Sequence, residues 1–466
     1  MRRLAVINVV GLTEDLLEKG MPRIQCLRQR GGMRSIRPAL PALTCSAQAN
    51  YLTGCKPSEH GIVANGWYDR NLAEVHFWKQ SNHLVQKPKI WENLKNSQPE
   101  FTCAKLFWWY NMHASADFSL TPRPMYPADG RKVFDIYSWP YEIRPAIKKE
   151  LGEFPFPTFW GPAAGLQTPQ GPPDAVSKWI AKSAEWIEER HQPTLNLIYL
   201  PHLDYNLQRL GPEHPRVGED LSRIDTIVGD LCDFLEASGV SVMLLSEYGI
   251  TPVNKPIHLN RLFRKKGWLT IKEELGRELI DFGASKVFAV ADHQVAHIYI
   301  NDPGKTHAVR QVLEAAEGID WVWDIHDKKV QGLDHERSGD LVAFSKDWAW
   351  FTYYYWMEDC RAPDFARCVD IHRKPGYDPV ELFLDPTLSF PRLAIAKRLL
   401  LKKLGFRMLM DVIPLDATLV KGSHGTRPAN ERHFPVMVTG ESDMLPDAKS
   451  IDSTAVAACI ESVLCM

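Results

Sequence analysis

The sequence lacks the features that define several large protein classes. Its 55 lysine and arginine residues almost balance its 57 acidic residues, so the net charge is only −2. That balance gives no reason to expect nucleic acid or a membrane as a partner. No apolar stretch reaches the roughly 18–20 residues that span a bilayer. With no internal repeat or low-complexity tract, the chain is expected to be globular.

The nine cysteines are odd in number and include no Cys-x-x-Cys pair. This excludes a full disulfide framework or a zinc ribbon and indicates reduced thiols. Arg2 and Arg3 precede a short apolar run at residues 4–10, which imitates a signal peptide. Acidic residues follow without a small-residue cleavage site, so we interpret this run as a buried strand. A cytoplasmic location is therefore expected.

Three apolar runs rich in β-branched residues each end in polar residues. They are LAVINVV at residues 4–10, TLNLIYL ending near Leu200, and VSVMLL ending at Leu245. Apolar runs without alternation, separated by helical stretches at 175–190 and 220–237, are typical of parallel strands covered on both faces. The sequence therefore predicts an α/β fold with a mostly parallel central sheet and helices on both faces.

The rest of the chain departs from this pattern. Residues of about 85–170 are dense in aromatic residues and prolines, which favours an irregular segment lining or covering a site. Residues 255–345 show the short strands and helices of a smaller α+β insertion. We therefore divide the chain into a first core part at 1–254, this insertion, and a return to the core at 346–466.

Polar residues stand where the predicted strands end. Asp204, preceded by His202, follows one strand, and Glu247 and Tyr248 follow another. In such sheets ligands bind beyond the carboxyl ends of the strands. Thr44 opens a predicted short helix, where a threonine is usually an N-cap. Its functional alternative is a nucleophile stabilised by the helix N-terminus or a metal ion.

Two further residues fit the same kind of site. Asn65 lies in an Asn-Gly turn, and it could donate a hydrogen bond to a bound tetrahedral anion. His424 lies between glycines, which allow its ring to approach a ligand closely. Carboxylates and imidazoles converging from separate loops are what a divalent metal requires. Each of these residues alone more often has a structural role, but together at the strand ends they favour a metal-binding site.

The ordered motifs PALT, YLTG..PSEHGIVANGWYD, LPHLDYNLQRLGP, SEYGI and GSHG resemble the alkaline phosphatase superfamily. The branch is that of nucleotide pyrophosphatases/phosphodiesterases and phosphonoacetate hydrolase. The resemblance implies two zinc ions and in-line attack by a Thr or Ser that becomes phosphorylated. By motif position, Thr44 is expected to be the nucleophile and Asn65 the donor to a phosphoryl oxygen. Asp204 and His424 are expected to bind one metal.

The sequence departs from this family at several metal ligands. Val10 stands where the family has an aspartate, and Gln208 stands where it has a histidine. Glu247 and Tyr248 replace an Asp-His pair. Val10 cannot ligate, and the phenol of Tyr248, with an ordinary pKa of ~10, is a poor zinc ligand. The metal beside the nucleophile is therefore the one most weakened, with Glu247 and Tyr248 as its altered candidate ligands. The other metal keeps Asp204 and His424 and could recruit Gln208 or His202.

Replacement ligands could come from elsewhere. His202, Asp292 and His293 are weaker candidates, although Asp292 and His293 could equally form a buried hydrogen-bonded turn and His297 could be a strand residue. Zinc is the metal that the resemblance implies, while oxygen ligands would suit Mg or Mn. Basic residues in Gly/Pro-rich loops could clamp an anion, although solvated loop charge is the commoner role. These candidates are Arg123, Lys132, His372 and Arg373.

The sequence thus predicts a metal-dependent hydrolase of a phosphate-containing small molecule that acts through Thr44. The substrate is expected to be a phosphodiester, a pyrophosphate or a phosphonate. One alternative is a relative that kept the fold, lost the metals and serves as an anion-binding or regulatory protein. Another is a mutase that moves phosphate within one substrate. Neither nucleic acid nor a membrane is expected as a partner.

Overall fold

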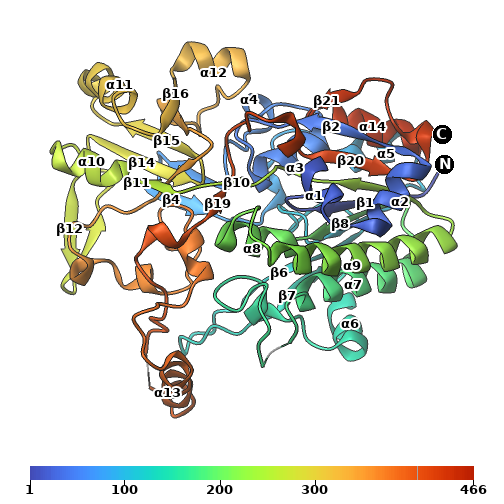
Figure 1. Ribbon diagram of the computed structural model, residues 1–466, viewed down its shortest axis with the longest axis horizontal. Helices are drawn as coiled ribbons and strands as arrows, with labels where there is room; N and C mark the ends of the chain where they lie inside the picture. Colours follow the sequence, from blue (N-terminus) through green and yellow to red (C-terminus); the bar gives the residue numbers. More distant parts are fainter. Residues whose placement is uncertain (170, 407) are drawn as a thin grey trace.

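The computed structural model describes residues 1–169, 171–406 and 408–466. Its largest unit is a nine-stranded sheet that joins strands far apart in the sequence (Figure 1). The order across the sheet is β21-β2-β20-β9-β1-β8-β5-β6-β7. The strands are β1 (Leu4–Val9), β2 (Gly32–Arg37), β5 (Cys103–Leu106), β6 (Phe118–Pro122), β7 (Ile136–Trp139), β8 (Leu195–Leu200), β9 (Ser241–Leu245), β20 (Val436–Thr439) and β21 (Ser450–Asp452).

The middle of this sheet is parallel. Strands β9, β1, β8, β5 and β6 form one continuous parallel block. Strand β20 runs antiparallel to both of its neighbours, β2 and β9, and β7 runs antiparallel to β6. Every residue of β1 and β8 is buried, which explains why these runs do not alternate. The predicted α/β fold with a mostly parallel sheet is confirmed.

Helices cover the sheet on both sides (Figure 1). On one side α7 packs against β8 and α9, and on the other α14 packs against α3 and α5. The helices of this part are α1 (Glu14–Glu18), α2 (Pro22–Arg30), α3 (Thr44–Thr53), α4 (Pro57–His60), α5 (Ile90–Ser97), α6 (Ile143–Leu151), α7 (Ala175–His191), α8 (His202–Leu210), α9 (Val217–Ala237) and α14 (Ala455–Leu464).

A second, antiparallel sheet lies within residues 255–345 and packs on its own apolar core. Its order is β14 (Val287–Asp292), β15 (Val295–Ile300), β17 (Leu341–Ser345) and β16 (Ile319–Trp323). Short pairs join β3 (Gly66–Asp69) to β4 (Glu74–Phe77), β10 (Thr251–Pro252) to β19 (Gly422–Ser423), β11 (Lys255–Ile257) to β18 (Ala349–Phe351), and β12 (Ile271–Glu274) to β13 (Arg277–Ile280). The division of the chain at residues 254 and 345 stays a prediction.

Two local expectations differ from the structure. The segment at about 85–170, expected to be irregular, contributes β5, β6 and β7 to the central sheet and also contains α5 and α6. The polar stretch after Leu200, expected to be a loop, forms helix α8. Its leucines at 203, 207 and 210 recur at helical spacing, and this pattern outweighed the polar residues between them.

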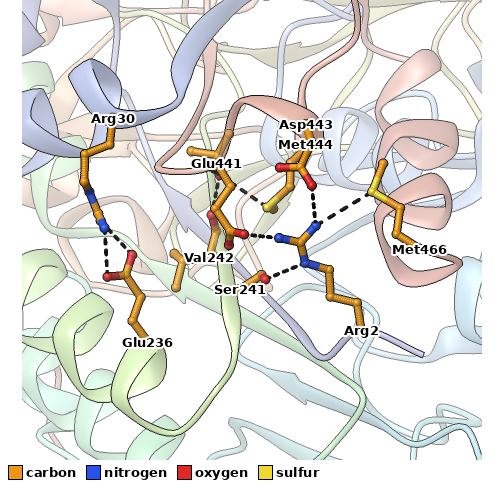
Figure 2. Close-up of polar contacts among 10 residues, drawn as sticks. Arg2, Arg30, Glu236, Ser241, Val242, Glu441, Asp443, Met444 and Met466 are labelled. Atoms are coloured by element: carbon orange, nitrogen blue, oxygen red, sulfur yellow. Dashed lines mark hydrogen bonds and ion pairs between the residues drawn. The ribbon is translucent and has the colours of Figure 1, made fainter.

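The two ends of the chain meet beside the central sheet. Figure 2 shows Arg2 between the start of β9 and the segment after β20. Its guanidinium donates to the Ser241 hydroxyl at 2.8 Å and to the Asp443 carboxylate at 2.9 Å, and it also pairs with Glu441. These contacts tie Arg2, which precedes β1, and the start of β9 to the segment that follows β20.

One helix stands apart from the rest. Helix α13 (Pro391–Lys403) projects from the body, at the bottom of the view in Figure 1. The other helices outside the central part are α10 (Leu259–Lys265), α11 (Thr306–Glu314) and α12 (Ile325–Gln331). Across the described residues, no helix combines the length and apolar composition needed to cross a membrane.

Candidate active site

Several of the predicted residues line one cavity of about 60 Å³. They come to it from four separate segments: Thr44 from the start of α3, Asp204 from α8, Tyr248 from the segment after β9, and His293 from the turn between β14 and β15. Most of the remaining wall is aromatic. It consists of Trp78, Trp109, Phe159, Trp160, Tyr199, Pro201, Tyr205, Ile371 and Tyr377. No lysine or arginine is among the described residues of this wall, so the cavity is apolar with a few polar groups on one side.

Thr44 occupies the first position of α3, after the extended residue Leu43. Its hydroxyl lies 3.2 Å from the hydroxyl of Tyr248, which donates to Oδ1 of Asp204 at 3.3 Å. A phenol has a single proton to give, and Tyr248 gives it to Asp204. Thr44 therefore donates its own proton to Tyr248. The result is a hydrogen-bond chain from Thr44 through Tyr248 to Asp204.

Four rings stack beside this chain. Tyr248 lies on His424 with 3.5 Å between ring centroids and an interplanar angle of 6°. His424 then lies 3.8 Å from His293, which lies 3.6 Å from Tyr377. Both imidazoles are buried, and burial lowers the pKa of each well below its ordinary value. Both rings are therefore neutral.

Asp204 is held at both of its oxygens. Tyr248 donates to Oδ1, and the Gln208 side-chain amide donates to Oδ2 at 2.8 Å. Tyr377, at the far end of the ring stack, donates to the Gln208 carbonyl oxygen at 3.0 Å. Burial raises the pKa of Asp204 to about 6, although the hydrogen bonds from Gln208 and Tyr248 oppose this shift. Gln208 therefore positions the Asp204 carboxylate but is not itself part of the described cavity wall.

Glu247 lies behind Thr44 and is absent from the described cavity wall. The side-chain amides of Asn8 and Gln48 both donate to its Oε1 at 2.5 Å. Burial raises the pKa of Glu247 to about 8, against the hydrogen bonds from Gln48 and Asn8. Val10 is fully buried in the apolar core. The region beside Thr44 is therefore filled by amides, a carboxyl group and a valine.

Asn65 links the start of α3 to the turn between β14 and β15. Its Oδ1 accepts from the Cys45 amide at 3.0 Å, while its own backbone and side-chain amides donate to Asp292 at 2.9 and 3.1 Å. Asp292 also bonds Nδ1 of His293 at 2.8 Å. The buried hydrogen-bonded turn considered for Asp292 and His293 is thus present, and His293 lines the cavity as well. In this conformation the Asn65 amide points to Asp292.

The residues fit the family's two-metal centre only in part. Val10 and the neutral phenol of Tyr248 do not fit a metal beside Thr44, and within the described ranges no three His, Cys, Asp or Glu side chains are grouped to hold an ion. The part of the site that holds His424 and His293 differs. Nδ1 of His424 is hydrogen-bonded to the Ala42 carbonyl at 2.8 Å, and Nδ1 of His293 is hydrogen-bonded to Asp292. Each Nε2 is buried and has no hydrogen-bond partner among the described residues. Two imidazoles fixed through Nδ1 suit one cation.

The remaining candidates lie away from the cavity. His202 faces α9, with Nε2 at 3.1 Å from Asp220. Arg373 pairs with Asp364, and His372 bonds the Phe77 carbonyl. Lys132 lies over the Phe134 ring, and Arg123 is exposed. The expected clamp residues Arg123, Lys132, His372 and Arg373 therefore contribute nothing to the described cavity wall.

Sequence reasoning missed most of the aromatic wall. The aromatic-rich segment at about 85–170 supplies Trp109, from FWWYNM at residues 107–112, and Trp160. Trp78 and Tyr377 carried no signal beyond being aromatic. Asn8 and Gln48, the partners of Glu247, were also missed, although Gln48 follows Thr44 by one helical turn.

Comparison with known proteins identifies the family of the chain. The sequence model of the type I phosphodiesterase / nucleotide pyrophosphatase family matches residues 4–378. An uncharacterized pyrophosphatase/phosphodiesterase of Schizosaccharomyces pombe is 24% identical over 272 residues, which are 55% of this chain. The match spans 47%, or about half, of that relative.

Solved structures share the fold. Murine ectonucleotide pyrophosphatase/phosphodiesterase 5, in an inactive form with AMP, is 15% identical with a TM-score of 0.59, covering 100% of this chain and 96% of its own. Phosphonoacetate hydrolase of Sinorhizobium meliloti, with phosphonoformate, is 12% identical with a TM-score of 0.62, covering 99% and 96%. The resemblance to the alkaline phosphatase superfamily is confirmed. This chain belongs to the type I phosphodiesterase / nucleotide pyrophosphatase family.

Proposed function

We propose that the chain hydrolyses a phosphodiester, pyrophosphate or phosphonate at this cavity, with Thr44 as the nucleophile. The observation that carries the proposal is the hydrogen-bond chain from Thr44 through Tyr248 to Asp204 at the cavity wall. Family membership supports the reaction class. The murine neighbour is inactive with one threonine replaced by alanine and binds AMP in that form, which supports a threonine nucleophile.

The cavity favours a small substrate. Its volume of about 60 Å³ is far below the roughly 300–1,000 Å³ of pockets that hold drug-sized ligands. A phosphoryl or phosphonyl group with a compact apolar or aromatic neighbour would fit better than a whole nucleotide. Trp78 and Trp109, whose rings lie 4.7 Å apart, would pack against that neighbour. The phosphonate bound by the bacterial neighbour is of this size class.

The reaction would proceed in two balanced steps. The Thr44 oxygen forms a bond to phosphorus while the bond from phosphorus to the leaving group breaks, and the hydroxyl proton passes through Tyr248 to Asp204. The proton held by Asp204 passes to the leaving group. Water then attacks phosphorus while the bond from phosphorus to the Thr44 oxygen breaks, one proton of that water restores the Thr44 hydroxyl, and free phosphate or a phosphomonoester departs. The N-terminus of α3 would favour the anion, although the Cys45 amide there already bonds Asn65.

A single divalent cation would complete the site, held by the Nε2 atoms of His293 and His424 with Asp204 as a charged neighbour. When bound, it would neutralise charge that develops on the phosphoryl oxygens. Imidazole ligands favour zinc, the metal that the resemblance implies, whereas Mg or Mn would need more oxygen ligands. His293 takes the place of ligands that Val10, Gln208 and Tyr248 no longer provide.

Replacing His293 with glutamine should remove this metal. Protein purified without chelator should carry one ion per chain by elemental analysis, and His293→Gln should carry about one tenth of that or less. His297→Gln is the matched control, because His297 is a buried neighbour whose two ring nitrogens already bond Val63 and Gly339. Two ions or none in the natural protein, or equal loss in both variants, would contradict the assignment.

Replacing Tyr248 with phenylalanine should lower kcat about 100-fold, with little change in KM, because it cuts the proton path from Thr44 but keeps the ring stack. Tyr377→Phe is the control, since it removes the equivalent hydroxyl at the other end of the stack without touching Thr44. Hydrolysis of an aryl phosphodiester reports the rates. Equal effects of the two changes would show that Tyr248 acts only through packing.

Product analysis tests the two alternative functions. A hydrolase releases free phosphate or a phosphomonoester, whereas a mutase would return an isomer of the substrate and an anion-binding protein would return it unchanged.

The cytoplasmic location expected from the sequence is also part of this proposal. It is supported by the nine unpaired cysteines, which suit a reducing compartment.

A further inference from the structure

Helix α13 carries an uncovered apolar face. No residue of the helix is buried, and Leu393, Leu400 and Leu404 at its exposed side are 68%, 57% and 64% exposed. Positions separated by seven and eleven residues fall within about 40° of each other around a helix. These three side chains therefore form one leucine stripe along the helix and its end. Phe390 and Phe406, at 74% and 62% exposed, flank it at either end.

The helix is also strongly basic. It contains five lysine and arginine residues and no acidic residue. Lys397 lies close to one side of the leucine stripe, and Arg392 and Lys403 lie on the other side. The opposite face attaches to the body, where Ile395 packs on the second core and Arg398 bonds Asp411 at 2.6 Å. The free face is thus apolar in the middle and positive at its edges.

We propose that α13 binds the surface of an anionic lipid bilayer. The leucine stripe and the two phenylalanines would enter the boundary between headgroups and acyl chains, while the flanking lysines and arginine meet anionic headgroups. The projection of α13 from the body leaves room for a flat surface (Figure 1). A second copy of the chain is a poor occupant, because symmetric pairing of this face would oppose two sets of positive charges.

This contact is peripheral and independent of the proposed hydrolysis. No residue of α13 is part of the described cavity wall. The proposed membrane contact of α13 differs from the expectation, drawn from the overall charge balance, that no membrane is a partner. The balance of the whole chain conceals the charge of one helix, because acidic residues elsewhere compensate for it.

Vesicle cosedimentation of the full chain tests the proposal. The protein should bind vesicles of phosphatidylcholine with about 30% phosphatidylserine at least tenfold more tightly than pure phosphatidylcholine, and salt should weaken this binding. A combined Leu393→Ser, Leu400→Ser and Leu404→Ser variant should lose binding at least about tenfold. The matched control is Leu72→Ser with Leu275→Ser, since both leucines are exposed in hairpin turns far from α13 in the sequence.

Sedimentation velocity without vesicles completes the test. The natural chain and the α13 variant should have the same oligomeric state, and both should retain hydrolytic activity. Equal vesicle binding by the α13 and control variants would overturn the proposal, as would no binding to anionic vesicles. A dimer that dissociates only in the α13 variant, without vesicle binding, would assign the face to a second copy.

Discussion

Replacing Thr44 with alanine is expected to lower the hydrolysis of an aryl phosphodiester at least about 1,000-fold. The change removes a hydroxyl that, alone among the described residues, combines a place in the cavity wall with a hydrogen bond to the Tyr248–Asp204 chain. Folding should be little affected, because the lost methyl and hydroxyl groups leave a gap at an existing cavity. Release of the aryl alcohol under substrate saturation gives the rate.

The control for this prediction is Thr44→Ser, which keeps a hydroxyl at the same position. It should retain the activity of the natural protein within about tenfold. Rapid quenching followed by peptide mass analysis should find a phosphoryl group on the Thr44 peptide of the natural chain and none in Thr44→Ala. Undiminished turnover by Thr44→Ala would sink the nucleophile assignment, whatever the metal content.

Replacing Lys374 with methionine is expected to destabilise the protein by about 3–5 kcal/mol. Lys374 is buried between Asp378 at 2.7 Å and Glu381 at 2.8 Å, and both of these carboxylates are buried too. Burial opposes the charge on Lys374, but the two carboxylates outweigh it and raise its pKa, so the lysine is held as a cation. Methionine would leave two buried carboxylates without their counter-ion.

Urea unfolding followed by tryptophan fluorescence measures this effect. Lys182→Met is a suitable control, because Lys182 pairs with Glu185 at the exposed surface and its loss should cost less than about 1 kcal/mol. Adding Asp378→Asn and Glu381→Gln to Lys374→Met should recover part of the stability. A loss in Lys374→Met no larger than in Lys182→Met would contradict a buried, charged triad.

The same triad shows a limit of sequence reasoning. Arg373 and His372 were candidates for clamping an anion, with solvated loop charge as the commoner role, and both side chains are exposed in the structure. Lys374, the next residue, enters the interior instead, and Glu381 also accepts from the Trp160 indole at 2.6 Å. Composition places charge in this loop, but it cannot tell which of three consecutive basic side chains faces inward.

Local signals selected three residues that the structure brings to one cavity. Thr44, Asp204 and Tyr248 each follow a feature visible in a short stretch, either a helix start or the end of an apolar run. Their partners could not be found in this way. Tyr377 reaches Gln208 across 169 residues of sequence, and Asn8 reaches Glu247 across 239. Such pairs depend on sheet order, which strand patterns alone do not determine.

The replacement of a family aspartate by Val10 predicts an altered metal centre, and this stays a prediction. Sequence reasoning asked which side chain replaces the missing metal ligand. In the structure, Asn8 and Gln48 instead bind the Glu247 carboxyl that such a metal would have used. These hydrogen bonds join residues from three separate segments, namely β1, α3 and the segment after β9. The spacing of these residues in the sequence does not indicate that they meet.

The place of β20 in the central sheet has a consequence for synthesis of the chain. β20 lies between β2 and β9, although these strands are made far earlier. During translation, β2 and β9 must wait with open edges until residues 436–439 leave the ribosome. Exposed edges of this kind invite pairing with other nascent chains. We expect the growing chain to rely on chaperones until β20 has been made.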